Sequence, residues 1–532
     1  MNPAGLLWGL LGVCLAAYPS PSLRRDNTST FQNPVIYEDF ADNDISLGPD
    51  GLYYFSASNM HYSPGAPILR SADLVNWDLI GHSVPSLDFG PQYNLTDGRA
   101  YRGGTWASTL RHRASNDLWY WIGCIDFWYT YTYTAPEIGG PWTRAAISDG
   151  GTCYYDCGLL IDDDDTMYVV YGATEVFVAQ LAADGLSQVR SQSILNASDV
   201  GEDGIEGNRM YKRNGFYYIL NDHPGDTTFI WKSTSPWGPY ESKILIRNVP
   251  SPVLGGGYPD QGSLIETPSG DWYYMSFTWA YPAGRMPILA PIVWGDDGFP
   301  SLIYDANGGW GATYPQPLPA VPTPPWTGID RFENSTLGPD WEWNHNPDET
   351  KYAAGGDEDG LTLSTATVTE DFYSARNTLT HRIHGEFPVG TLQVDISNMA
   401  DGDRFGLAAF RDRTAYLGVH RNDGTNTLTL VHNITQDETS WATTRNGTVK
   451  AKAELPADIT TLWLRALLDA RASGTLDANF SYSLDGSEYV QIGEPYTLWT
   501  SYAYFMGYRF GIFNYATKAL GGSVRLSYFE SA

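Results

Sequence analysis

The stretch "EDFADNDISLGPDGLYYFSAS", residues 38–58, holds the unit on which the fold depends. Carboxylates crowd its start, a Gly-Pro-Asp-Gly turn follows, and an aromatic strand closes it. Asp is normally depleted in strands, so acids at a strand mouth call for an explanation. Three interpretations compete: a solvated acidic turn, a calcium loop, or one carboxylate aimed at a ligand.

The same unit recurs along the N-terminal part of the chain. An aromatic strand follows a Gly, Asp or Asn turn in "GLYYFSAS" (51–58), "DLWYWIG" (117–123), "DTMYVVYG" (165–172), "GFYYILN" (215–221) and "DWYYMSF" (271–277). The spacings are uneven but lie in the range of propeller blades. Five such units predict a five-bladed β-propeller over residues 31–313. A β-sandwich of equal length is the structural alternative, although it would not need five matching hairpins.

The remainder of the chain has a different pattern. The proline-dense segment "YPQPLPAVPTPPW", residues 314–326, predicts a stiff, extended connector. Residues 327–532 alternate turns with short strands such as "LTLSTATV" and "FSYSLD", which predicts a two-sheet β-sandwich without a catalytic constellation. The predicted fold class is therefore all-β, with a five-bladed propeller followed by a sandwich.

Composition restricts the class of ligand. The 532 residues carry a formal net charge of −29, which argues against a nucleic-acid partner because phosphates need basic surfaces. Aromatic residues reach 14% while charged residues are only 17%. Aromatic faces and scattered carboxylates suit a neutral ligand that is rich in hydroxyl groups, such as a sugar.

The N-terminus and the sequons indicate the compartment. The apolar run from Leu6 to Ala17 is too short to span a bilayer and predicts a signal peptide over residues 1–20. No later stretch predicts a membrane helix. Seven Asn-x-Ser/Thr sequons agree with secretion: Asn27, Asn94, Asn196, Asn334, Asn433, Asn446 and Asn479. We expect a secreted, extracellular glycoprotein that is monomeric.

Three cysteines lie beyond the leader, namely Cys124, Cys153 and Cys157. An odd number permits at most one internal disulfide, and the pairing stays open. The Cys153-x-x-x-Cys157 spacing has no histidine or second cysteine pair nearby, so we expect no zinc site.

The repeat also orders the polar residues. A step of ten to thirteen residues back from each aromatic strand reaches the start of the innermost strand of each predicted blade. Those positions hold Asp42, Trp106, Asp156, Glu206 and Asp260. Equivalent register would bring all five to one end of the propeller axis. Asp42 is therefore predicted to face that axis, while Glu38, Asp39 and Asp44 would serve the turn or the rim.

Carboxyl groups that converge on one site are typical of a glycosidase. One carboxyl group donates a proton to the leaving oxygen and a second acts on the anomeric side. A third acid nearby raises the pKa of the donor by like-charge repulsion and so keeps it protonated. Trp106 would offer a flat face to a sugar ring.

Five segments carry a family resemblance. In order, "NPVIYEDFADNDISLGPDGLYYFSAS", "GGTWASTL", "YYDCGLLIDDDDTMYVVYG", "IEGNRMYKRNGFYYIL" and "GRMPILAPIVWGDDGFP" resemble glycoside hydrolase family 43 over residues 33–302. The C-terminal "WEWNHNPD" and "DGDRFGLAAF" resemble the concanavalin-like sandwich of fungal secreted arabinofuranosidases and xylosidases. The resemblance implies a five-bladed propeller that works with inversion of stereochemistry.

The resemblance also implies roles for single residues. It makes Asp42 the general base, Asp156 the acid that modulates pKa, and Glu206 the general acid. Arg285 matches a substrate-binding arginine, and Trp106, Tyr155 and Asp260 complete the expected substrate contacts. Alternatives stay open for three of these residues: Trp106 as propeller core, Arg285 as partner of a buried acid, and Tyr155 as packing.

The sequence departs from the family pattern at three positions. Asn43 and Cys157 each replace a common proline, and Asp260 stands where relatives usually have an axial histidine. Because that histidine helps to organise a central ion or water cluster, its loss argues against a structural calcium, and no cofactor is expected. The same loss favours a non-catalytic glycan-binding protein as an alternative.

The sequence thus predicts a glycosidase that acts on plant cell-wall polysaccharide, arabinoxylan or arabinan. The nearest resemblance favours an α-L-arabinofuranosidase. A β-xylosidase is the first alternative, because both substrates are compact pentosides and residue spacing does not distinguish them.

Overall fold

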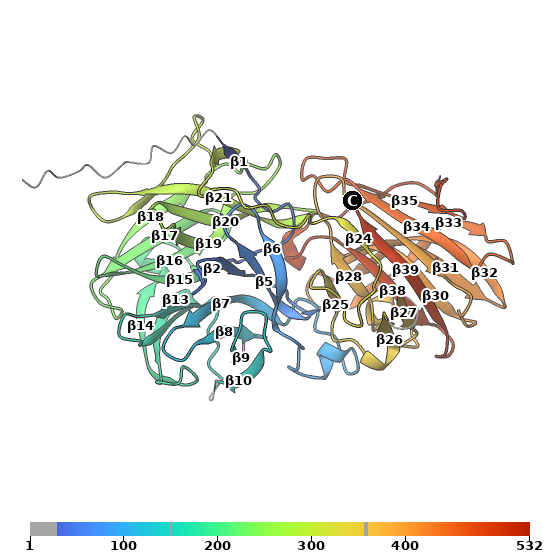
Figure 1. Cartoon of the computed structure of the whole chain (residues 1–532), viewed down its shortest axis with the longest axis horizontal. Coiled ribbons are helices and arrows are strands. Elements are labelled where there is room, and N and C mark those ends of the chain that lie inside the picture. Colours follow the sequence, from blue (N-terminus) through green and yellow to red (C-terminus); the bar gives the residue numbers. More distant parts are fainter. Residues whose placement is uncertain (1–28, 149–150, 356–359) are drawn as a thin grey trace, which may run out of the picture.

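The computed structural model describes residues 29–148, 151–355 and 360–532, which form β-strands almost throughout (Figure 1). The helices among them are five short 3₁₀ turns, and none is long and apolar enough to cross a membrane. These turns are η1 (Pro91–Asn94), η2 (Ala197–Val200), η3 (Glu349–Lys351), η4 (Phe372–Ser374) and η5 (Tyr502–Tyr504). The predicted signal peptide, residues 1–20, and the sequon at Asn27 lie outside the described residues.

The N-terminal part forms five antiparallel sheets of four strands each, arranged around one axis (Figure 1). Blade 1 contains β2 (Asp44–Leu47), β3 (Tyr53–Ser56), β5 (Gly65–Ser71) and β6 (Asp78–Val84), and blade 2 contains β7 (Thr105–Arg113), β8 (Leu118–Ile125), β9 (Tyr129–Ala135) and β10 (Thr143–Ile147). Blade 3 contains β11 (Gly158–Ile161), β12 (Met167–Ala173), β13 (Glu175–Leu181) and β14 (Gln188–Asn196), and blade 4 contains β15 (Glu206–Arg213), β16 (Phe216–His223), β17 (Thr227–Ser233) and β18 (Glu241–Arg247). Blade 5 contains β19 (Pro259–Glu266), β20 (Trp272–Ala280), β21 (Gly284–Trp294) and β22 (Pro300–Leu302). The predicted five-bladed propeller is confirmed.

The position of a strand within its blade explains its composition. Strands β3 and β20 are aromatic and are buried almost throughout, because neighbouring blades cover both of their faces. The outermost strands β10 and β14 are mostly exposed, and neither contains an aromatic residue. The aromatic repeat in the sequence therefore marks the second strand of each blade.

A separate two-stranded ribbon joins the ends of the propeller. Strand β1 (Thr30–Gln32) pairs antiparallel with β23 (Thr313–Pro315). Next to it, the Asn33 side-chain amide donates to the carbonyls of Leu289 and Gly311 at 2.9 Å each. The start of the chain is thus tied to blade 5 by side-chain bonds as well as by the ribbon.

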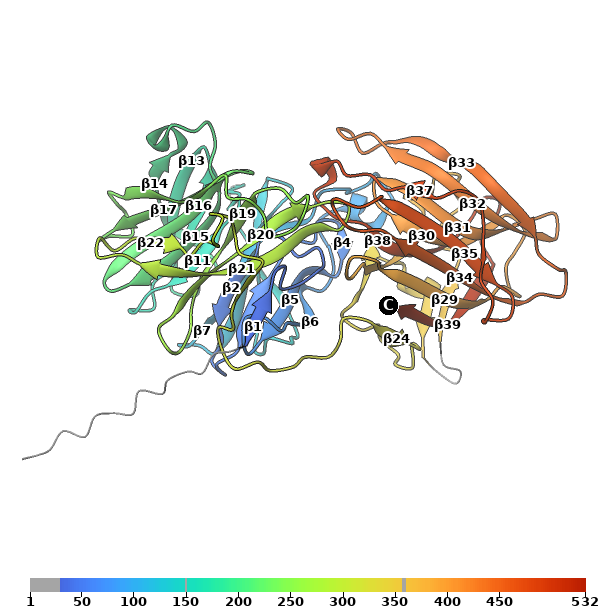
Figure 2. The same cartoon turned by 90° about the horizontal axis from the view of Figure 1, so that it is seen from above.

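The C-terminal part is a sandwich of two large sheets (Figure 2). One sheet follows the order β33 (Thr443–Glu454), β32 (Thr425–Gln436), β31 (Arg413–Asn422), β30 (Asp403–Phe410), β38 (Arg509–Ala516), β28 (Leu379–Arg382), β25 (Trp341–Asn344) and β4 (Tyr62–Ser63). The other follows β26 (Tyr352–Ala354), β27 (Leu361–Ser364), β39 (Ser523–Ser531), β29 (Val389–Asp395), β34 (Thr461–Leu468), β35 (Asp477–Ser483) and β36 (Val490–Gln491), with β24 (Gly328–Asp330) on β39 and β37 (Tyr496–Thr497) on β35. Leucines such as Leu407 and Leu464 fill the space between them.

The two domains share a sheet. Strand β4 belongs to the propeller by sequence, yet it pairs with β25 and forms the edge of the eight-stranded sheet. Beside it, Glu342 of the sandwich is fully buried and binds His82 of the propeller at 2.8 Å and Arg382 at 2.7 Å. The interface therefore contains backbone pairing and buried charge together.

The proline-rich segment, residues 314–326, is attached to both domains. Its last residue, Trp326, stacks on His384 of the sandwich at an interplanar angle of 9°. The same indole lies 5.8 Å from the ring of Phe40 in the propeller. The connector thus fixes the two domains against each other and is no free spacer.

The cysteine pairing left open by the sequence is Cys124 with Cys153. It joins the end of β8 to the chain that enters blade 3, on the side where the acids gather. Cys157 is a buried free thiol.

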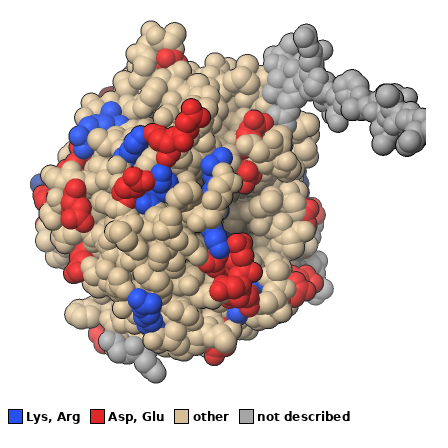
Figure 3. Space-filling view, turned by 90° about the vertical axis from the view of Figure 1, so that its left-hand side faces the viewer, with Lys and Arg blue, Asp and Glu red and all other residues tan. Residues whose placement is uncertain are grey.

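On the propeller face drawn in Figure 3, the described Lys and Arg side chains form no continuous basic surface. On this face, acidic and basic side chains form separate small clusters among uncharged residues (Figure 3). A nucleic-acid partner would need a continuous run of cations.

Candidate active site

A pocket of about 670 Å³ opens where the propeller faces the sandwich. Its walls come from all five blades and from the sandwich loop that precedes β38. The lining residues are Asp42, Arg102, Trp106, Phe127, Tyr155, Asp156, Glu206, Pro224, Gly225, Gln261, Trp279, Tyr281, Arg285, Thr500, Tyr502 and Phe505. Both domains are needed to complete the pocket.

The three acids reach this pocket through local backbone geometry. Asp42 and Asp156 each lie two residues before the innermost strand of their blade, with φ of 59° and 47°. Left-handed backbone is tolerated by Asp better than by most residues and is typical of functional sites. Glu206 is the first residue of β15. The three acids therefore occupy equivalent positions at the start of the innermost strands, and their carboxyl groups lie at the same end of the propeller axis.

Asp42 is held from two sides. Its Oδ2 accepts from the Ser58 hydroxyl at 2.5 Å, and its Oδ1 accepts from Arg285 Nη1 at 2.8 Å. The side chains of Asp42 and Arg285 are both nearly buried. The arginine supplies a counter-charge to this buried carboxylate.

Glu206 lies in the opposite electrostatic environment. Burial raises its pKa above the ordinary value; the hydrogen bond from the Tyr155 hydroxyl, at 2.8 Å, opposes this shift, and the charges of Asp260 and Asp42 add to it. Arg285 lowers the pKa by a smaller amount. A carboxyl group with a raised pKa retains its proton and is suited to act as a general acid.

Asp156 is the most strongly perturbed of the three acids. Burial, followed by the charges of Glu206 and Asp42, raises its pKa well above the usual range. Arg209 and the Gly207 N–H, which donates to Asp156 Oδ2 at 3.2 Å, oppose this rise without cancelling it. The charges of both Glu206 and Asp42 therefore act on Asp156.

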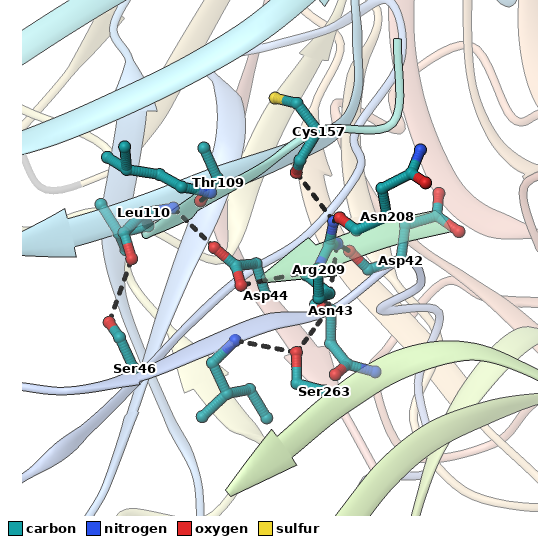
Figure 4. A network of polar contacts seen from close by, with 12 residues as sticks. Asp42, Asn43, Asp44, Ser46, Thr109, Leu110, Cys157, Asn208, Arg209 and Ser263 are labelled. Carbon is teal, nitrogen blue, oxygen red and sulfur yellow. Dashed lines mark hydrogen bonds and ion pairs between the residues drawn. The ribbon is translucent and has the colours of Figure 1, made fainter. Parts of the chain in front are cut away.

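Behind these acids lies a network in which every charge has a partner (Figure 4). The fully buried Arg209 donates to the carbonyl oxygens of Asp42 at 2.8 Å and Cys157 at 2.8 Å. Its Nε lies 3.4 Å from Asp44 Oδ1. Asp44 also binds both terminal nitrogens of Arg111, at 2.7 and 2.9 Å. The expectation that Asp44 serves the turn or rim is wrong, since its side chain is completely buried at the axis.

Aromatic rings hold the cations on the sandwich side of the pocket. The Arg102 guanidinium lies 4.4 Å from the ring centre of Phe505 and 5.3 Å from that of Trp106. Arg285 lies 5.5 Å from the same Phe505 ring. One sandwich side chain thus contacts two propeller arginines, and such contacts contribute about 0.5–2 kcal/mol each.

Comparison with known proteins now bears on this geometry. Residues 31–300 match the family described as glycosyl hydrolases family 43. The chain belongs to family 43. Residues 329–531 match the beta xylosidase C-terminal concanavalin A-like domain, so the sandwich is concanavalin-like as the sequence predicted. The protein is accordingly a glycoside hydrolase of the family that its motifs resembled.

Several relatives extend over most of this family 43 chain. A beta-xylosidase of Formosa agariphila is 26% identical over 94% of this chain and 90% of its own. A non-reducing end alpha-L-arabinofuranosidase of Bacteroides ovatus is 29% identical over 65% of this chain and 66% of its own. Their names differ in the sugar that is released.

A solved structure resembles this family 43 protein more strongly. It shares 41% sequence identity with a TM-score of 0.90 and covers 95% of this chain and 100% of its own. It is described as a family 43 glycoside hydrolase engineered in its active site, with both endo-xylanase and exo-arabinofuranosidase activity.

Six of the seven site residues predicted from the sequence line the pocket; the exception is Asp260. Asp260 is buried behind the wall, where its Oδ2 accepts from the Trp279 indole at 3.0 Å. Of the open alternatives, Arg285 both pairs a buried acid and borders the pocket. Tyr155 lines the pocket and bonds Glu206, whereas Trp106 is partly buried and packs against Phe127.

The acids are not arranged as a calcium cage. Among the residues that the structure describes, no group of three or more His, Cys, Asp or Glu side chains could hold a metal ion. The charged partners of the acids are arginines instead.

Sequence reasoning missed several wall residues. Arg102 directly precedes the "GGTWASTL" motif, and Trp279 ends the last aromatic strand, so both lay within reach of the repeat. Tyr502 and Phe505 come from the sandwich, where no catalytic constellation was expected. No signal in the propeller repeat could have identified residues contributed by another domain.

Proposed function

We propose that this family 43 enzyme removes α-L-arabinofuranosyl residues from arabinoxylan or a related hemicellulose, with inversion at the anomeric carbon. The observation that carries the proposal is the convergence of Asp42, Asp156 and Glu206 on one pocket, with an arginine on the first and a raised pKa on the last. Inverting glycosidases need such a division between an ionised base and a protonated acid.

Each acid has a distinct role in this reaction. Asp42, which pairs with Arg285, takes a proton from the water that attacks the anomeric carbon. Glu206, protonated and hydrogen-bonded to Tyr155, gives its proton to the leaving oxygen. Asp156 orients Glu206, because it accepts a hydrogen bond from the N–H of the adjacent Gly207 at 3.2 Å.

The pocket suits one sugar ring at the end of a chain. A space of about 670 Å³ lined by Trp106, Phe127 and Trp279 offers aromatic faces, while the acids and arginines supply hydrogen-bond partners. The arabinofuranosyl specificity rests on the 41% identical structure described with exo-arabinofuranosidase activity. The name of the Formosa relative favours a second candidate, a β-xylosidase acting on xylo-oligosaccharides.

One screen separates these candidates. Purified protein is incubated with wheat arabinoxylan, debranched arabinan and xylo-oligosaccharides, and the first product is followed by proton NMR. Release of arabinose as the inverted anomer is the expected result. Release of xylose alone selects the β-xylosidase. Retention of configuration overturns the proposed mechanism, and binding without any product favours the non-catalytic alternative.

We further propose that the protein is secreted as a glycosylated monomer. The Cys124–Cys153 disulfide suits an oxidising compartment. The sequon residues Asn334 and Asn446 are exposed and accessible to glycosylation. Recovery of the protein from culture medium, a mass decrease after endoglycosidase treatment, and light scattering at one chain mass would support this proposal. An intracellular, unmodified oligomer would contradict it.

A further inference from the structure

Two buried carboxyl groups face each other directly behind the acid of the pocket. Asp222 lies on β16 opposite Glu206 of β15 in the strand pairing, and Asp260 lies at the start of β19 in the next blade. Their exposed fractions are only 2% and 4%. The two side chains lie within hydrogen-bonding reach of each other, and the buried Oδ1 atom of each has no hydrogen-bond partner among the described residues.

This contact requires a proton. Carboxylate oxygens are acceptors only, so two ionised groups would repel each other and leave both buried Oδ1 atoms without a donor. A single proton between them turns the repulsion into a hydrogen bond. The pair then carries one negative charge instead of two.

The surroundings decide which residue holds the proton. Burial raises the pKa of Asp260, but this rise is opposed by the contact with Asp222, by the backbone N–H of Gly225 and by the Trp279 indole, which donates to Asp260 at 3.0 Å. Asp222 faces the charges of Glu206 and Asp156. Burial, then the charge of Asp260 and the contact with it, and then these two like charges raise the pKa of Asp222 well above the usual range. The proton therefore belongs to Asp222, which donates to Asp260.

The backbone next to Glu206 passes directly over this pair. Gly207 has φ of +70°, and a Cβ there would lie 2.1 Å from Asp222 Oδ1. Only glycine permits this approach, because the conformation and the space both exclude a side chain. The backbone of Gly207 therefore packs Glu206 closely against the Asp222–Asp260 pair.

Given the role proposed above for Glu206, we propose that Asp222 and Asp260 share one proton as a single-charge pair and are positioning residues that keep Glu206 protonated until it reacts. The charge on Asp260 contributes to the raised pKa of Glu206. The other charged or titratable groups that face these three carboxyls are Asp42, Asp156, Tyr155, Arg209, Tyr274 and Arg285. The pair acts through this field and does not touch the pocket.

Two isosteric variants test the pair, each removing one carboxyl group. D260N removes the charge, so Glu206 should lose its proton more easily and the alkaline limb of kcat/KM should move down by about one pH unit. D222N replaces the protonated acid by an amide that also donates to Asp260, so the limb should stay within about 0.3 pH unit of wild type. Equal shifts in both variants, or a larger shift in D222N, would overturn the proposal.

An infrared measurement tests the shared proton without using activity. At pH 7 the full-length protein should show the C=O stretch of a buried protonated carboxyl group, and the difference spectrum against D222N should isolate it. If no such band is lost in D222N, the pair is wrong whatever the kinetics show. If the wild type is inactive but the band is present, the proposed function fails and the pair stands. Should D260N not fold, the infrared result on D222N decides alone.

Discussion

Two charged regions lie along the same axis of the propeller, and they differ in what neutralises them. In the inner network, Asp44 is completely buried, yet Arg111 and Arg209 outweigh the effect of burial and lower its pKa. In the pocket layer, Asp156 is equally enclosed, and burial with neighbouring carboxylates raises its pKa well above the usual range. Burial alone therefore does not set the protonation state; the number of arginines does.

The difference teaches which charges serve stability and which serve chemistry. In the inner network, each buried charge has an oppositely charged partner, and these ion pairs hold the innermost strands in place. In the pocket layer, the carboxyl groups outnumber the arginines, which lowers the free energy of unfolding but keeps a proton available for the reaction. Such local conflicts with stability are typical of active sites. Four substitutions would break or sharpen this comparison, in decreasing order of expected effect.

The largest effect is expected from E206Q in the pocket layer. Loss of the proton donor should lower kcat by about 10²- to 10⁴-fold, with little change in the melting temperature. Pentose release and thermal unfolding would be measured on the same preparation. E202Q is the matched control, because Glu202 lies four residues earlier and pairs with Arg247 at the surface. Activity of E206Q within a few-fold of wild type would refute its role as the acid.

The next effect is expected from D44N in the inner network, and here stability should change. The substitution leaves Arg209 and Arg111 without their buried counter-charge, which should cost about 3–5 kcal/mol of unfolding free energy. Denaturant unfolding would measure it. D78N is the control, since it removes only an exposed pair with Arg70, worth about 0–1 kcal/mol. Equal losses in the two variants would contradict the distinction between the regions.

A moderate effect is expected from F505A, which tests how the pocket holds its cations. Within the described residues no carboxylate pairs with Arg102, and the Phe505 ring contacts both Arg102 and Arg285. Removal of the ring should lower kcat/KM by roughly tenfold, corresponding to about 1.4 kcal/mol of cation–π and packing contact. The loss should appear mainly in KM. Steady-state kinetics with an unchanged KM would show that the sandwich ring is dispensable for binding.

The smallest effect is expected from D156N, and its sign is a gain in stability. Because the pKa of Asp156 is raised in the folded state, this residue stabilises the fold most at low pH. That contribution is lost as the pH rises above the unfolded value of about 3.9. D156N should therefore be about 1 kcal/mol more stable than wild type at pH 7, or about 2 °C in melting temperature. The gain should vanish near about pH 3.5, and a gain that is independent of pH would disprove the linkage.

Much of the fold could be predicted from the sequence because the aromatic repeat reflects a structural environment that recurs in every blade. Each aromatic strand is the second of its blade and is buried on both faces, so the same residue types recur wherever that environment recurs. The register of the repeat also placed Asp42, Asp156 and Glu206 at one end of the axis. These residues depend on local geometry within each blade, which sequence patterns reflect.

The rest of the site depends on contacts that no local pattern records. Asp44 was expected at the rim, and only its distance from Arg111 and Arg209, both far along the chain, reveals it as buried. Tyr502 and Phe505 border the pocket because the sandwich docks there. Asp260 occupies an innermost strand start, as expected, but it lies behind the wall because the Trp279 indole binds it there. Tertiary docking decided each of these cases.

Strand β4 sets a limit on how this protein can be taken apart. If the chain were cut within the proline-rich segment, residues 314–326, β25 would lose its neighbour β4. Its unpaired backbone N–H and C=O groups would then be exposed to solvent, and exposed edge strands promote self-association. A fusion of the propeller to another domain would therefore have to include residues 341–344 or replace the pairing between β4 and β25. The two domains therefore form one structural unit.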